Sequence, residues 1–294
     1  MERRTIFSGW LLPVALVLPQ LALTVVFFLW PAGQAIWSSA TRADPFGIRT
    51  EFVGLDNLTD LFADPLYVDT VIRSVVFCVC VTVLAVSAAM ALAVTADREI
   101  RFRGFYRIML IWPYAIAPAV AAVLWILLLH PQIGLIGRWL NGIGIAWDYK
   151  INGFQAMLMV ILASAWKQVS YNFIFLLAGL QSIPRSVVEA ARMDGAKGFY
   201  RFRTVLLPLL MPTVFFLMVV NLVYAAFDTF GTIWAITAGG PGKATETLVV
   251  KVYRDGMVNQ DVGSSSAQSV VLMVGVIVLT ALQFRFLGRR SGGA

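Results

Sequence analysis

The sequence alternates between long apolar runs and shorter polar segments. Each run is free of charged residues except for one lysine in the fourth. At 1.5 Å per residue, each is long enough to cross a hydrocarbon core of about 30 Å as a helix. Helices are the only plausible form, because lipid offers no partner to free backbone groups. The pattern predicts an all-α integral membrane protein of a single domain, residues 1–294, with six transmembrane helices at about 11–37, 74–95, 108–129, 155–180, 205–227 and 263–285.

The first apolar run has an alternative interpretation as a cleaved signal peptide, because Arg3 and Arg4 precede it. The run is longer than the roughly 7–15 apolar residues typical of a signal peptide, and no clear A-x-A cleavage site follows it. We therefore expect a retained membrane anchor.

Prolines lie inside the predicted spans, among them Pro113 and Pro118 in the third and Pro208 and Pro212 in the fifth. A proline removes a backbone donor and kinks a helix. Membrane bundles tolerate such kinks where neighbouring groups satisfy the freed backbone, so both spans remain candidates.

Composition agrees with a bilayer environment. Of the 294 residues, 59% are hydrophobic and 13% charged, and the mean hydropathy is +0.79. Soluble domains are about half apolar and about a quarter charged, so a water-soluble enzyme is disfavoured. One histidine and two cysteines, Cys78 and Cys80 inside an apolar run, also argue against a metal centre or a disulfide scaffold.

The distribution of Lys and Arg predicts the orientation. With the N-terminus inside, the inner segments hold 14 of the 23 Lys and Arg residues and the longer outer segments hold eight, with Lys167 inside a span. Inner loops of membrane proteins carry this excess. We expect both termini in the cytoplasm, and the net charge of +7 reflects this bias rather than nucleic-acid binding.

The inner segment between the fourth and fifth spans, 184–203, is too long for a simple turn. Pro184 suits a helix start, and Ser186 with Glu189 three residues later fits a capping box. The small residues Ala190 and Ala191 lie on one helical face, and Gly195 is expected to weaken the helix near its middle. One interpretation is a helix lying on anionic lipid, but an alanine face buries little area in lipid and favours close docking of another protein.

The same segment resembles the EAA motif of ABC-importer permeases, EAA-x3-G-x9-I-x-L-P. Glu189-Ala190-Ala191, Gly195 and Leu207-Pro208 match it at the right spacing, and Val205 in place of isoleucine is the one departure. A second stretch is similar to the outer loop of the carbohydrate-type permeases in this family. It comprises Phe227-Asp228, Thr237-Ala238-Gly239-Gly240-Pro241 and Ala244-Thr245-Glu246-Thr247-Leu248. Over nearly its whole length the chain resembles the permeases of sn-glycerol-3-phosphate importers.

The resemblance implies a type I importer permease fold in the bacterial cytoplasmic (inner) membrane. It also implies a second homologous permease chain, two ATP-binding cassette subunits that bind the ATP and Mg, and an extracytoplasmic substrate-binding protein. The segment 184–203 would be the coupling helix, whose contact with the ATPase would include Glu189, Ala190, Ala191, Asp194 and Gly195. The cargo would be sn-glycerol-3-phosphate or a glycerophosphodiester, with a neutral sugar or polyol as the alternative.

The chain itself is expected to bind no nucleotide or other cofactor. The stretch from Gly239 to Thr245 superficially resembles a phosphate-binding loop, but that loop requires G-x4-G-K-[ST] between a strand and a helix. Thr237 replaces the first glycine and Ala244 follows Lys243. We interpret Gly239, Gly240 and Pro241 as a tight turn.

Polar residues inside the spans predict a substrate path. Lys167 lies near the middle of the fourth run, and polar residues in spans usually face the bundle interior. Helical spacing puts Ser164, Ser170 and Tyr171 beside Lys167, and puts Asn221, Tyr224 and Asp228 on one face of the fifth span. Lys167 suits a phosphate-bearing substrate, and a structural salt bridge is the alternative.

Two other function classes fit less well. An ion-coupled secondary transporter needs intramembrane acidic residues, and none lies within the six predicted spans. A membrane enzyme needs a nucleophile and base pair, which the single histidine and scarce carboxylates do not offer.

Overall fold

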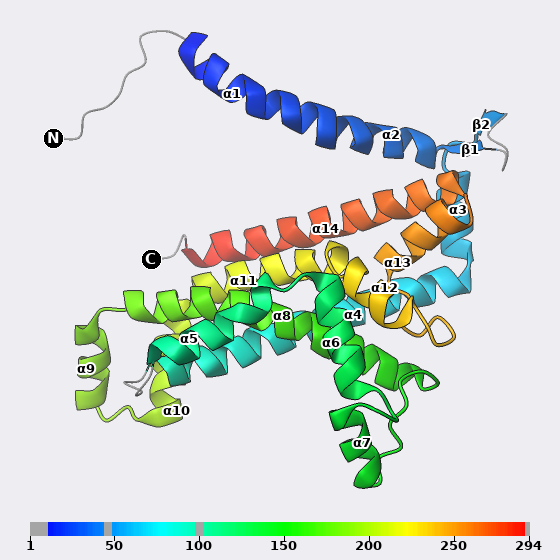
Figure 1. Cartoon of the computed structure of the whole chain (residues 1–294). Coiled ribbons are helices and arrows are strands. Elements are labelled where there is room, and N and C mark those ends of the chain that lie inside the picture. Colours follow the sequence, from blue (N-terminus) through cyan, green and yellow to red (C-terminus); the bar gives the residue numbers. More distant parts are fainter. Residues whose placement is uncertain (1–10, 44–48, 98–102, 292–294) are drawn as a thin grey trace. The chain divides into compact units, whose positions relative to one another are not determined.

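The computed structural model describes residues 11–43, 49–97 and 103–291, which are mostly helical (Figure 1). They form two compact units, one from residues up to 64 together with 252–271, and one from 65–251 together with residues from 272 onward. Two helices, α13 (Leu248–Tyr253) and α14 (Val262–Ser291), contribute residues to both units.

The first unit begins with a continuous helical segment. It contains α1 (Leu11–Thr24), η1 (Val25–Leu29), α2 (Trp30–Ser39), β1 (Thr41–Ala43), β2 (Thr50–Phe52), α3 (Asp56–Ala63) and η4 (Arg254–Val258). The two short strands pair antiparallel. The side-chain amide of Asn57 donates to the carbonyls of Ser39 and Thr41 at 2.9 Å each, which joins α3 to the end of α2.

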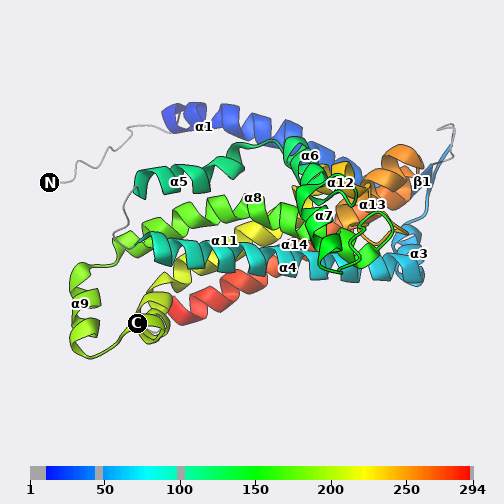
Figure 2. The same cartoon turned by 60° about the horizontal axis from the view of Figure 1, so that its bottom comes forward.

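The second unit is a helical bundle. It contains α4 (Pro65–Ala96), α5 (Arg103–Ile111), η2 (Trp112–Ala115), α6 (Pro118–Leu129), α7 (Leu135–Gly142), α8 (Gly153–Ser182), α9 (Arg185–Met193), α10 (Gly198–Arg201), η3 (Phe202–Leu206), α11 (Leu207–Phe227) and α12 (Phe230–Thr237). Helices α4, α8 and α11 run side by side and contact one another (Figures 1 and 2).

Small residues let these helices approach closely. Ala85, Ala89 and Ala93 follow one another at intervals of four on α4, and each is fully buried. In lipid, packing and interhelical hydrogen bonds hold helices together, and small residues favour both. Larger side chains from α8 and α11, among them Phe173 and Leu217, fill the remaining space. This stripe explains why α4 can contact both other helices.

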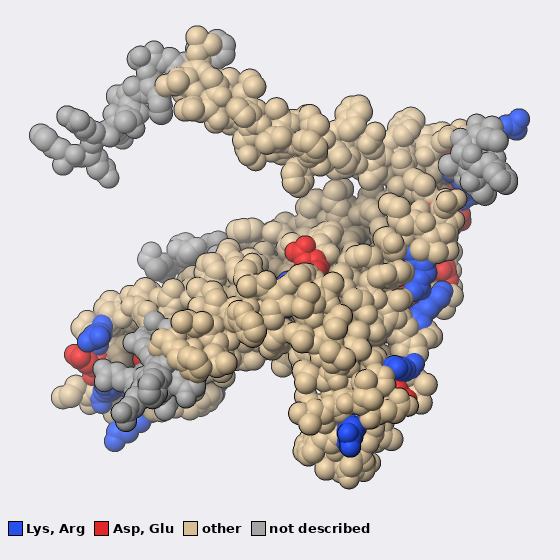
Figure 3. Space-filling model, viewed as in Figure 1, with Lys and Arg blue, Asp and Glu red and all other residues tan. Residues whose placement is uncertain are grey.

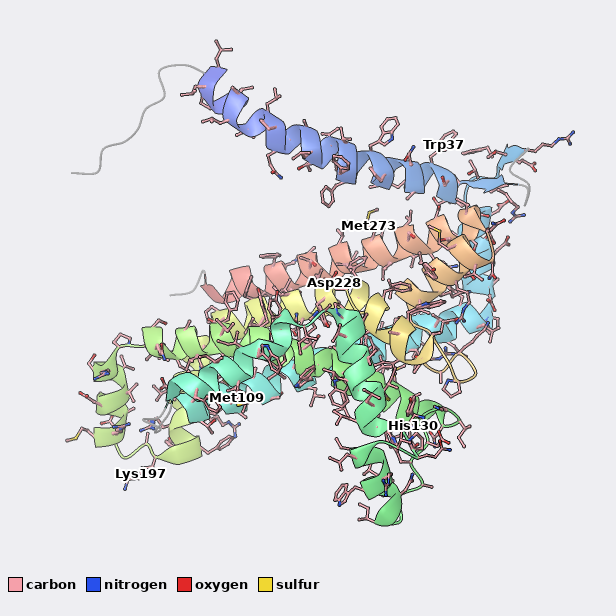
Figure 4. The ribbon with its side chains drawn as sticks, in the orientation of Figure 1. Trp37, Met109, His130, Lys197, Asp228 and Met273 are labelled. Carbon is pink, nitrogen blue, oxygen red and sulfur yellow. The ribbon has the colours of Figure 1, made fainter. Side chains whose placement is uncertain are left out.

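The two ends of the bundle differ. Helices α9 and α10 lie at one end, and α7 and α12 lie toward the other (Figures 1 and 2). The charged side chains of the bundle gather near these ends, and the surface between them is largely uncharged in Figure 3. An acidic group at the centre of that view is the exception, and Figure 4 labels Asp228 there.

Among the described residues, five helical segments are long and apolar enough to cross a membrane. They are Leu11–Ser39, Pro65–Ala96, Gly153–Ser182, Gly198–Phe227 and Val262–Arg285. These correspond to five of the six predicted spans. The second starts nine residues before the predicted position, because its first turns carry Asp69 and Arg73 and the prediction used a charge-free run.

The third predicted span is not one continuous helix. Ile108–Ala115 and Pro118–Leu129 meet at a bend of 110°, and together they would count as a sixth span. Ile116 and Ala117 have extended backbone, with ψ of 130° and 142°. A residue before proline is driven toward that conformation, and Pro118 then starts α6. The break is therefore larger than a simple proline kink.

Candidate functional site

A cavity of about 680 Å³ opens in the second unit, between the broken third span and helices α8 and α11. Its wall combines three tyrosines, two charged residues and one amide with apolar side chains. The lining residues are Tyr114, Pro118, Lys167, Gln168, Tyr171, Val219, Val220, Val223, Tyr224 and Asp228. A cavity with several polar groups inside an apolar bundle is the default candidate for a ligand site.

The charged residues of the cavity lie on different helices. Lys167 is half-buried on α8, and Asp228 is exposed where α11 ends (Figure 4). In the part of the chain that the structure describes, no direct ion pair joins them. The ammonium group of Lys167 is therefore not neutralised by a direct contact with Asp228, and it can offer its donors to an anion in the cavity.

Aromatic rings form one side of the cavity. The rings of Tyr114 and Tyr171 lie with centroids 5.6 Å apart at an angle of 32°. The ring centroids of Tyr171 and Phe175 lie 4.8 Å apart, so the row of aromatic rings continues along α8. Tyrosine combines an apolar ring with a hydroxyl group that can donate or accept, so these residues suit a ligand with both carbon and oxygen surfaces.

Four of the seven residues predicted for the path line this cavity, namely Lys167, Tyr171, Tyr224 and Asp228. The other three do not. Ser164 and Ser170 are buried in the bundle, at 0% and 1% exposure, and Asn221 is buried against Asn172. Helical spacing correctly places residues on a face, but it does not say which part of that face another helix covers.

Sequence reasoning missed Tyr114, Pro118 and Gln168. Gln168 is an uncharged polar residue beside Lys167 inside a span, so the sequence could have indicated it as a cavity residue. Tyr114 stands between Pro113 and Pro118, and only the break of the third span turns it toward α8. The valines of α11 gave no signal, because apolar residues are expected throughout a span.

Helix α9, at one end of the bundle, presents the EAA residues. Glu189 and Ala190 are exposed, and Ala191 is buried. The helix begins at Arg185 with Pro184 as its N-cap, and no side chain forms a capping hydrogen bond. The predicted capping box between Ser186 and Glu189 is therefore wrong, because the helix starts earlier than that motif requires. Glu189 is left facing outward.

Gly195 ends α9 rather than weakening its middle, which corrects the prediction. Its φ is +80°, a conformation that glycine adopts without strain. The amide of Gly195 donates to the carbonyl of Arg192, and that of Ala196 donates to the carbonyl of Ala191. This pair of bonds is the Schellman motif of helix ends. Asp194 is the C-cap before it, and Pro208 lies in the first turn of α11.

The outer-loop motif folds into a compact turn between α12 and α13. The hydroxyl groups of Thr237 and Thr245 lie 2.6 Å apart, and Thr245 donates to the carbonyl of Gly240 at 2.8 Å. Gly239 has φ +87°, and the peptide between Gly240 and Pro241 is cis. The turn follows a helix, not a strand, so it lacks the setting of a phosphate-binding loop.

Two hydrogen bonds fix this turn to the first part of α4. The guanidinium of Arg73 donates to the carbonyl of Lys243 at 2.7 Å, and the amide of Leu248 donates to the hydroxyl of Ser74 at 2.8 Å.

In the described residues, no cluster of three His, Cys, Asp or Glu could hold a metal ion.

Comparisons with known proteins agree over the whole chain. The family described as "Binding-protein-dependent transport system inner membrane component" matches residues 3–291. The sn-glycerol-3-phosphate transport system permease protein UgpA of Brucella abortus is 56% identical over 288 residues, 98% of either chain. The protein of the same name from Rhizobium meliloti is 52% identical over 288 residues, again 98% of either chain.

Solved structures share the fold. A chain of a bacterial alginate ABC transporter, in complex with an alginate pentasaccharide-bound periplasmic protein, has a TM-score of 0.82 at 19% identity. The match covers 97% of this chain and 96% of that one. A chain of a bacterial ABC transporter involved in alginate import has a TM-score of 0.78 at 21% identity. This match covers 94% of the present chain and 96% of the other. The fold is therefore that of ABC-importer permeases, as predicted.

Proposed function

Because this chain belongs to the family of inner membrane components of binding-protein-dependent transport systems, we propose that it is the permease subunit of an ABC importer for sn-glycerol-3-phosphate or glycerophosphodiesters. It is a multi-pass membrane protein, and we place it in the bacterial inner membrane. The relatives that share more than half of its residues carry the name of that substrate.

The observation that carries the proposal is the position of Lys167, a cation half-buried in a cavity within the membrane-spanning bundle. A charge at such depth is costly, and it usually serves a transport path or a structural pair. Lys167 forms no direct ion pair with Asp228 among the described residues. A phosphate group of the substrate would supply the missing partner, with Tyr171 and Tyr224 available to its remaining oxygens.

In the proposal, the energy for transport comes from partner chains. Two ATP-binding cassette subunits would bind ATP and Mg, and this chain would contribute the transport path rather than a nucleotide site, a cofactor or a catalytic residue. Glu189 and Ala190 are exposed on α9 and would contact a cassette subunit, while Gly195 sets where α9 stops. A substrate-binding protein would deliver cargo at the opposite end, and a second homologous permease would complete the pathway.

Transport then follows from alternating access. Closure of the cassette dimer would move α9, and with it α8 and α11, whose more distant residues line the cavity. The cavity would open to one side of the membrane at a time. The substrate must meet different surroundings in the two states for such a change to be driven.

The test is uptake by the assembled complex in proteoliposomes, with sn-glycerol-3-phosphate outside and ATP inside. We expect Lys167→Met to raise the apparent KM about tenfold or more, since a hydrogen bond to a charged group contributes about 1.5–3 kcal/mol. Lys150→Met, which removes an exposed lysine from an outer loop, is the matched control and should leave KM unchanged. Unchanged kinetics for Lys167→Met would reject the site.

A neutral sugar or polyol is the second candidate, and one observation favours it. Three tyrosines and both signs of charge line the cavity, a surface that also suits a hydroxyl-rich ligand. The two cargoes are separated by competition: glycerol or a neutral sugar should not inhibit uptake of the phosphorylated substrate if the proposal is correct.

A further inference from the structure

Two asparagines join α8 and α11 inside the bundle. The amide nitrogen of Asn172 donates to the side-chain oxygen of Asn221 at 3.1 Å, and the amide nitrogen of Asn221 donates back at 2.7 Å. The second N–H of Asn221 bonds the carbonyl of Leu217 at 2.7 Å. Both side chains have 0% exposure. The pair thus forms a closed ring of two hydrogen bonds between two helices.

Such a pair is sensitive to position. Both bonds are retained only while the two amide groups face each other at about 2.7–3.2 Å with good alignment. One residue of sliding along a helix moves a side chain by about 1.5 Å and rotates it by about a quarter turn. The surrounding side chains, Phe173 and Leu217 among them, are apolar and would accept a range of offsets. The asparagines therefore select one register of α8 against α11.

The pair lies directly behind the cavity wall. Asn172 follows Tyr171 in the sequence, and Asn221 precedes Tyr224 by one helical turn. Lys167 is on the same helix as Asn172, and Asp228 comes directly after the helix that carries Asn221. Neither asparagine lines the cavity. The register that they select determines how far the residues of α8 stand from those of α11.

We infer that Asn172 and Asn221 are a positioning pair, which holds α8 and α11 as one rigid wall and thereby sets the spacing of Lys167 and Tyr171 from Tyr224 and Asp228. This inference rests on the proposed use of the cavity as the substrate site. The pair acts on substrate affinity through other residues, without contact with the substrate.

The test compares Asn172→Leu, Asn221→Leu and the double variant in the full importer complex, measuring apparent KM, maximal uptake and the amount of assembled complex. Each single change removes the partner amide and leaves polar atoms of the remaining buried amide unsatisfied, so we expect less assembled complex. We also expect a KM raised about tenfold, since misplacement of about 1 Å in a site has effects of this size or larger. The double change leaves no amide unpaired, so assembly should recover while KM stays raised.

The control is Thr82→Val on α4, an isosteric change that removes a buried hydroxyl with no hydrogen-bond partner in the described part of the chain. It should alter neither assembly nor KM. A double variant with the KM of the unmodified protein would overturn the inference, because the pair would then contribute to stability alone. A double variant that fails to assemble would also overturn it.

The two proposals can fail separately. If Lys167→Met raises KM and the double asparagine variant does not, the substrate site stands and the positioning pair is rejected. If Lys167→Met has no effect on KM, the proposed site is rejected and the inference about its spacing is rejected with it.

Discussion

At the scale of single residues, the backbone conformation of Gly195 restricts which amino acids can replace it. Its φ of +80° allows the two hydrogen bonds that close α9, and the open space around it would admit a side chain. Strain, and not steric clash, therefore restricts substitution here. A branched residue in this conformation costs about 1–3 kcal/mol, whereas asparagine adopts it more readily.

We expect Gly195→Val to lower ATP-driven uptake several-fold while the protein still inserts and assembles, because the strain would displace the end of α9 that the proposal assigns to the cassette contact. Gly195→Asn is the matched control and should retain most of the uptake. ATP hydrolysis and uptake, measured together in proteoliposomes, report the coupling. Uptake by Gly195→Val equal to that of the unmodified protein would contradict the proposed role of Gly195 in coupling.

Residue types differed in how well the sequence located them. A lysine within a span was a strong signal, because a buried charge needs a reason, and Lys167 does line the cavity. Serine and asparagine gave weaker signals, because they can be buried or paired within the bundle. Asn221 pairs with Asn172, and Ser164 is buried with no hydrogen-bond partner among the described residues. Their spacing alone could not distinguish these environments from a cavity.

At the scale of elements, the apolar runs identified five helical segments that are long and apolar enough to span a membrane, since lipid excludes charge from such segments, but two of the five begin seven and nine residues before the predicted start. The failures have separate causes. Helix α4 extends beyond its charge-free run, and the third span breaks where two extended residues precede Pro118. The compact fold of the outer turn, fixed by Arg73 and Ser74, depends on contacts between distant residues that no local pattern contains.

Ser74 provides a test of that outer turn. Its hydroxyl accepts from the amide of Leu248 and donates to the carbonyl of Thr70, and both Ser74 and Leu248 are buried. Ser74→Ala would leave the Leu248 amide without a partner, at a cost of about 1–3 kcal/mol. We expect a lower thermal midpoint in detergent. Thr82→Val, on the same helix, removes a buried hydroxyl that has no hydrogen-bond partner among the described residues, so it should not lower the midpoint. An equal loss of stability in both variants would contradict the argument.

At the scale of the whole molecule, the candidate functional features of the second unit lie at different positions along the length of its bundle. The exposed Glu189 lies at the end formed by α9, the anchored turn lies near the other end, and the cavity lies between them. Figures 1 and 2 show α8 running from one end to the other. This separation follows from helices longer than the apolar core that they cross.

The 110° bend between Ala115 and Pro118 also determines whether the number of membrane crossings in the chain is even or odd. If its two arms make one crossing, the polar segments before and after them face different compartments; if the arms turn back, both segments face the same one. Cysteines introduced at Asp97 and Lys150, in a background without Cys78 and Cys80, answer this with an impermeant maleimide. We expect labelling of intact cells at position 150 alone, with position 97 reacting only after permeabilisation. Protection of both positions in intact cells, with both reacting after permeabilisation, would make the bent segment a re-entrant hairpin and reverse the sidedness of every later loop.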